Sequence, residues 1–157
     1  MALKPVGVLL SRKRPTVLNG MDYKRRPAHY VYEGVSGGDV IVGGDTDVSF
    51  SNNGPLEGIA HTTGSSVSIT STGTYKIDYK VNLTDGVGAA IAIAVNGTAN
   101  QSTSVPVLAA PGQVSGTAIL DLNADDIITL RNDSSATSFT LSGEAGVDAQ
   151  LSVLRLD

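Results

Sequence analysis

The amino-acid sequence predicts an all-β protein, built as an antiparallel sandwich, jelly roll or barrel, with a basic arm in front of it. Apolar and polar residues alternate strictly in the longest candidate strand, and turn-forming residues then recur at intervals of about ten residues. No segment keeps a helical period, and no apolar run approaches the ~18 residues of a membrane span. The 157 residues therefore fit one β domain with one core.

The clearest strand is predicted over residues 74–84. Every second side chain in it is apolar and the intervening ones are polar, which is typical of a half-buried antiparallel strand. We expect its apolar face to lie in the core or at a subunit contact. The residues of this face are Tyr75, Ile77, Tyr79 and Val81, followed by Leu83.

The segment 88–95 is predicted as a strand that is apolar on both faces. Ala90, Ala92 and Ala94 share one face, and larger aliphatic residues share the other. The Asn96-Gly97 pair that follows is a hairpin-turn signal, which favours a strand over a helix. A face of apolar side chains should be covered, either by another sheet or by another subunit. A trimer contact through these alanines is the working expectation, and internal sheet packing explains the same pattern.

Further strands complete the expected sandwich. Clusters of Asn, Asp, Ser and Gly separate them, and such clusters form turns. The expected strands are residues 67–70, 113–122, 126–131, 138–142 and 148–156.

Charge divides the chain into two parts. Residues 1–30 carry seven basic residues against one acidic residue, a net charge of +6, whereas residues 31–157 carry four against fourteen, a net charge of −10. We expect residues 1–35 to form an extended arm, residues 36–45 a Gly-rich hinge and residues 46–157 the β domain. The acidic β domain should repel nucleic acid and anionic membranes, and the arm should seek an acidic partner.

Six segments of the β region together resemble a known domain. They are 48–50 (Val-Ser-Phe), 53–54 (Asn-Gly), 58–61 (Gly-Ile-Ala-His), 73–75 (Gly-Thr-Tyr), 95–97 (Val-Asn-Gly) and 118–125 (Ala-Ile-Leu-Asp-Leu-Asn-Ala-Asp). The series is similar to the C-terminal jelly roll of the collagen-like glycoprotein of bacterial spore surfaces. That domain belongs to the complement globular-head and tumour-necrosis-factor superfamily. The resemblance implies a jelly-roll sandwich that assembles as a homotrimer.

The front of the chain resembles another family. Residues 4–13 (Lys-Pro-Val-Gly-Val-Leu-Leu-Ser-Arg-Lys), 19–20 (Asn-Gly) and 24–28 (Lys-Arg-Arg-Pro-Ala) are similar to the opening segment of bacteriophage head-fibre proteins. This resemblance implies that the arm attaches to the major capsid protein and that the trimeric knob projects from the outer capsid surface. The expected anchoring residues are Val8, Leu9, Leu10, Arg12, Lys13, Arg14, Lys24, Arg25, Arg26 and Tyr30.

The two resemblances imply a structural protein. One reading is a capsid decoration protein of a virion that aids capsid stability or adheres to a host surface, with a surface glycan as a compatible partner. The alternative is an adhesin or ligand-binding module on a spore surface, with the arm held in a spore coat layer.

Other function classes find little support in the residues. The chain has no cysteine, two histidines and no serine in a nucleophile-elbow context, so we expect no enzyme, no cofactor and no metal centre. Asp125 and Asp126 follow Asn123 in one turn, and whether a cation binds there is left open. Apolar patches separate the basic clusters of the arm, which favours docking on a protein over binding of nucleic acid.

Overall fold

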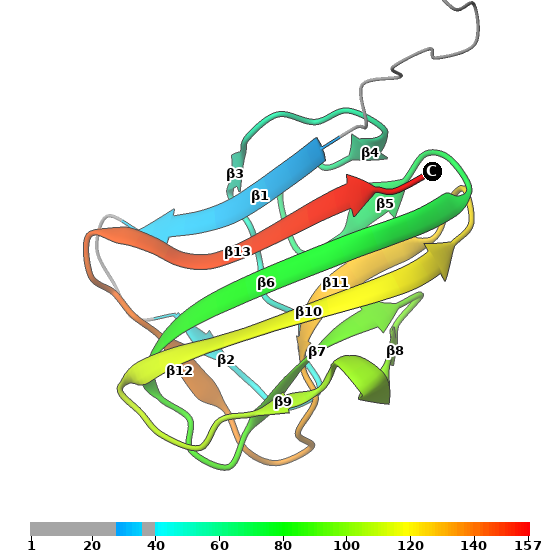
Figure 1. Ribbon diagram of the computed structural model, residues 1–157. Coiled ribbons are helices and arrows are strands. Elements are labelled where there is room, and N and C mark those ends of the chain that lie inside the picture. Colours follow the sequence, from blue (N-terminus) through cyan, green and yellow to red (C-terminus); the bar gives the residue numbers. More distant parts are fainter. Residues whose placement is uncertain (1–27, 36–39) are drawn as a thin grey trace, which may run out of the picture.

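The computed structural model describes residues 28–35 and 40–157, and these residues form two antiparallel β-sheets packed face to face (Figure 1). The predicted all-β fold is confirmed. Among the described residues the one helical segment is a short 3₁₀ helix, η1 (Gln101–Thr103), and no helix is long and apolar enough to cross a membrane.

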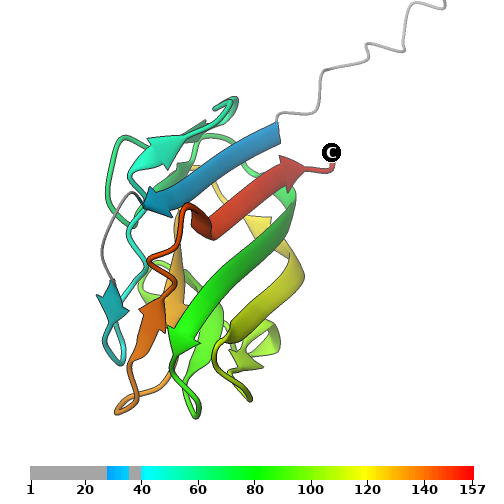
Figure 2. The ribbon, with the colours of Figure 1, turned by 90° about the vertical axis from the view of Figure 1, so that its left-hand side faces the viewer.

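The larger sheet has seven strands. Its order is β2 (Ile41–Val42), β12 (Phe139–Leu141), β6 (Gly73–Asp85), β13 (Gly146–Arg155), β1 (Ala28–Val35) and β3 (Asn52–Asn53), and β10 (Gly112–Leu122) pairs with β6. Figure 2 shows β1, β13, β6 and β10 side by side in one layer. The long β6 is central, because β10 pairs along one side of it while β13 and then β12 pair along the other.

The second sheet has six strands. Its order is β4 (Ile59–Ala60), β5 (Val67–Ile69), β11 (Ile127–Asn132), β7 (Ala90–Val95) and β8 (Thr98–Ala99), and β9 (Val105–Pro106) pairs with β7. The expected hairpin turn joins β7 to β8, where Asn96 and Gly97 both adopt positive φ. Such angles suit Asn-Gly and match the right-handed twist of the two strands.

The core lies between the sheets, and β6 supplies much of it. Tyr75, Ile77, Tyr79 and Val81 are at most 3 % exposed, whereas the intervening residues of β6 are half-buried on the outer face. The hydroxyl of Tyr79 crosses to the second sheet and donates to the carbonyl oxygens of Ile91 (3.0 Å) and Thr103 (2.9 Å). Burial raises the pKa of Tyr79 to about 12.

The β domain begins earlier than the sequence analysis expected. Residues 28–35, assigned there to the arm, form β1, which pairs with β13 from Ala28 opposite Leu154 to Val35 opposite Gly146. Residues 41–42, assigned to the hinge, form β2 on β12. The physical reason is that β1 extends the sheet beyond β13 and buries Val31 completely.

Asn132 fastens the loop between β11 and β12. Its side chain is fully buried and donates to the carbonyl oxygens of Val42 (3.1 Å) and Thr137 (2.8 Å). Its Oδ1 accepts from the backbone N–H (3.1 Å) and the hydroxyl (2.6 Å) of Ser134. One amide side chain therefore links β2 to the loop between β11 and β12.

Replacing Asn132 with alanine should lower the free energy of unfolding by about 2–3 kcal/mol, because a fully buried amide and its four hydrogen bonds are lost. Asn123→Ala, at an exposed asparagine in the β10–β11 turn, should change it by about 0.5 kcal/mol or less. Urea denaturation of both variants measures the difference. Equal denaturation midpoints for the two variants would contradict this stabilising role of Asn132.

Candidate functional site

The expected anchoring residues lie mostly outside the described part of the chain. Val8, Leu9, Leu10, Arg12, Lys13, Arg14, Lys24, Arg25 and Arg26 all precede Ala28, where the described residues begin. Tyr30 is the exception, and the structure places it in β1, opposite Ser152 of β13. Its backbone belongs to the sheet, so the separate arm ends before it.

The alanine face of β7 is covered by the chain itself. Ala92 and Ala94 are fully buried and Ala90 is half-buried. Strand β11 flanks β7 on one side, β8 and β9 flank it on the other, and η1 packs against it. The Thr103 hydroxyl of η1 accepts from the backbone N–H of Ile93 at 2.8 Å. Burial within one chain, the alternative that the sequence left open, therefore accounts for Ala92 and Ala94.

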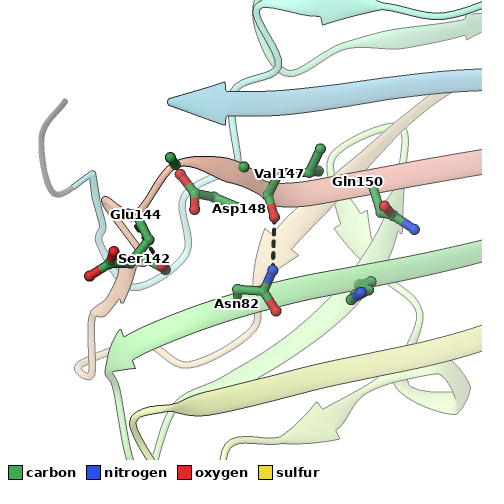
Figure 3. Close-up of a pocket in the computed structure, with 9 residues that line it drawn as sticks. Asn82, Ser142, Glu144, Val147, Asp148 and Gln150 are labelled. Carbon is green, nitrogen blue, oxygen red and sulfur yellow. Dashed lines mark hydrogen bonds between the residues drawn. The ribbon is translucent and has the colours of Figure 1, made fainter. Parts of the chain in front are cut away.

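A polar recess opens on the outer face of the larger sheet (Figure 3). Strand β6 pairs with β13 as far as Val81 opposite Ala149, and with β12 from Leu83 onward. Between these two pairings the loop at residues 142–145 leaves the sheet. The resulting cavity has a volume of about 480 Å³.

Asn82 joins the two sides of this recess. Its side-chain amide donates to the carbonyl oxygen of Val147 at 2.8 Å, and its backbone carbonyl accepts from the N–H of Ser142 at 2.9 Å. Its Oδ1 in turn accepts from Gln113 Nε2 at 2.8 Å. The walls are therefore held at a fixed separation in the absence of any ligand.

Polar side chains line most of the recess. In Figure 3, Ser142, Glu144 and Asp148 lie toward one end and Gln150 toward the other. Glu144 is exposed, whereas Asp148 is only 2 % exposed. Lys80 supplies a positive charge, and Ala145, Gly146 and Val147 add small apolar groups. No local sequence pattern predicts this site, because the site depends on two strands that separate along a third.

His61 is held in the loop between β4 and β5. It is 8 % exposed, its Nδ1 faces the Oδ1 of Asn53, and its Nε2 lies 3.1 Å from the carbonyl oxygen of Gly64. Its ring also meets Phe50 edge-on, with ring centroids 6.4 Å apart. The histidine therefore joins β3 to a turn. A shallow cavity of about 360 Å³ lies beside it and contains no assembled nucleophile, base and orienting group.

The turn at residues 123–126 uses the carboxylate of Asp126 internally. Asp126 Oδ1 accepts from Asn96 Nδ2 and its Oδ2 accepts from the N–H of Asn123, both at 2.8 Å. These hydrogen bonds lower the pKa of Asp126. Asp125 stands beside it with positive φ. Among the described residues no three acidic or histidine side chains gather as metal ligands would.

One family model matches most of the chain. The model of the BclA C-terminal domain matches residues 33–157, which include the last three residues of β1 and every later strand. No curated protein matches the chain. The match begins within β1, in agreement with a β domain that starts before residue 36.

Solved structures share the fold at low sequence identity. The Eiger TNF from S. frugiperda has a TM-score of 0.59 at 18 % identity, with 84 % of this chain and 94 % of that chain covered. Murine APRIL at pH 8.5 has a TM-score of 0.57 at 16 % identity, with 84 % and 100 % covered. The PRD1 vertex protein P5 has a TM-score of 0.53 at 12 % identity, with 84 % and 98 % covered. These likenesses establish the tumour-necrosis-factor-like jelly roll.

Proposed function

Because the chain belongs to the BclA C-terminal domain family, we propose that it is a structural surface protein: a trimeric knob fixed to the outside of a phage capsid by residues 1–27. The division of charge carries this proposal. Residues 1–27 hold all seven basic residues of the front part against Asp22, a net charge of +6, and the rest of the chain has a net charge of −10.

Trimer formation would multiply both charges. A body of about −30 stays off an acidic shell, while three basic arms reach three neighbouring sites and bind with avidity. Apolar residues between the basic clusters, such as Val8, Leu9 and Leu10, would supply the desolvated part of each contact with the major capsid protein.

The contact between copies requires a surface other than the buried alanines of β7. The outer face of the larger sheet is the surface that we propose, at the half nearest the chain termini. Ile119 of β10 is 62 % exposed there, and β10 is an edge strand that pairs with β6 alone among the described strands. An exposed aliphatic side chain beside an unpaired strand edge is a frequent feature of subunit contacts.

Ile119→Asp should convert the trimer into a monomer, because it places a charge in a dry contact. Light scattering should fall from about three chains per particle to about one. Ile127→Asp, at a 40 % exposed isoleucine of the other sheet, is the matched control and should remain trimeric. A wild-type monomer at micromolar concentration would contradict the trimer, and a trimeric Ile119→Asp would contradict the contact.

A second candidate function follows from the family itself. The same knob would serve as an adhesin or ligand-binding module on a spore surface, with residues 1–27 held in a coat layer. Fractionation of the native source separates the two. We expect the protein to band with virions in a density gradient, and banding with spores instead would favour the second function.

A further inference from the structure

We propose that the recess between β12 and β13 is a binding site for a neutral saccharide. The inference deepens the proposed function, since a knob on a particle surface meets glycans on other surfaces. It rests on the shape, the rigidity and the chemistry of the recess.

The size and position of the recess suit a small polar ligand. Its volume of about 480 Å³ lies within the range of small-molecule sites and has room for about one or two sugar rings. It lies at the end of β6 where Asp85, Gly112 and Gly146 cluster, away from Ala28 and Asp157. The recess is therefore at the end of the domain away from a tether at Ala28.

The lining groups match hydroxyl groups better than other chemistries. Glu144 can accept hydrogen bonds, Lys80 can donate them, and Ser142 can do both. Sugar hydroxyls both donate and accept, so such a mixed set satisfies them. The short apolar stretch at residues 145–147 offers contact to the C–H groups of a ring.

Competing ligands fit less well. Two carboxylates against one lysine disfavour a phosphate or another anion. No aromatic or large aliphatic side chain other than Val147 lines the recess, so an apolar ligand would gain little. The fixed separation that Asn82 maintains between the walls also lowers the entropic cost of binding.

The test uses the full chain and a panel of D-galactose, N-acetyl-D-galactosamine, N-acetyl-D-glucosamine, L-rhamnose and L-fucose at tens of millimolar. In amide NMR spectra, at least one sugar should shift the resonances of residues 142–150 and follow a saturable titration. Inorganic phosphate and Ca²⁺ serve as probes of the competing chemistries. Shifts at the same amides with phosphate or Ca²⁺ alone, or no response to any sugar, would overturn the proposal.

Two substitutions test whether the saccharide binds in the recess. Glu144→Ala and Ser142→Ala should each weaken the binding of the responding sugar about fivefold or more, because each removes a hydrogen bond. Glu57→Ala and Ser135→Ala, at exposed residues outside the recess, are the matched controls and should bind as the wild type does. Equal affinity in all four variants would place the saccharide elsewhere. Saccharide binding is measured on free protein. A negative result would therefore not bear on attachment to a particle, and a failure of attachment would not bear on saccharide binding.

Discussion

Tyr79→Ala is expected to lower the free energy of unfolding by about 3–5 kcal/mol, among the largest effects of any single substitution in this chain. The ring is 3 % exposed at the centre of β6, and its hydroxyl donates to the carbonyl oxygens of Ile91 in the opposite sheet and of Thr103 in η1. The change removes a large core side chain and leaves both carbonyl oxygens without this donor. Denaturant titration measures it. Lys80→Ala, on the outer face of the same strand, should change stability by about 0.5 kcal/mol or less.

Tyr79→Phe separates the contribution of the ring to stability from the contribution of the hydroxyl. It should cost about 1–2 kcal/mol, because only the hydrogen bonds are lost. The raised pKa adds a pH test, since the folded state holds the neutral phenol more strongly than the unfolded state does. The stability that the neutral Tyr79 hydroxyl contributes is fully present below pH 10 and is lost as the pH rises through about 12. Tyr79→Phe should lose less stability than the wild type over that window. A larger effect of Lys80→Ala than of Tyr79→Ala would mean that the strand faces the other way.

Deleting residues 2–26 should abolish attachment to capsids while leaving the folded trimer intact. The deletion removes all seven basic residues of the front segment and stops before β1, whose pairing with β13 begins at Ala28. Co-sedimentation with capsids measures the loss, and circular dichroism checks the fold. A deletion to residue 32, which the expected boundary at residue 35 would have allowed, removes Val31 and most of β1, and so should also destabilise the β domain.

Charge reversal tests the same attachment without shortening the chain. Replacing Arg12, Lys13 and Arg14 with glutamate should weaken co-sedimentation, because the attraction to an acidic shell is reduced. The binding to capsids that remains should depend less on salt concentration. The melting temperature should stay unchanged. If the deletion variant still decorates capsids at full occupancy, the base of the jelly roll and not residues 1–27 is the docking surface.

The sequence predicted best where a local pattern decides the structure. The alternation around Tyr79 determines which face of β6 is buried, and the Asn96-Gly97 turn marks the end of β7. Both depend on neighbours within a few residues. The later strands β10 to β13 were also found to within about two residues, since turn-forming clusters bound them.

Features that depend on distant segments escaped prediction. Strand β1 follows a basic run and precedes a glycine cluster, and its place in the sheet is set by β13, more than a hundred residues later. The elements that pack around Ala92 and Ala94 do so through contacts that no local sequence periodicity indicates. The recess exists because β12 and β13 share one side of β6. In each case topology, and not residue pattern, decides the outcome.

The pairing of β1 with β13 determines how the molecule bears mechanical force. Ala28 lies opposite Leu154, and β1 runs from there toward the far end of the sandwich, where the loops at residues 86–89 and 107–111 lie. A pull between a tethered N-terminal segment and those loops is directed along the strand axis. The hydrogen bonds between β1 and β13 are then strained together, in shear, and do not open one after another from the end. A knob tethered through β1 in this orientation resists extraction more strongly than its unfolding free energy alone would indicate.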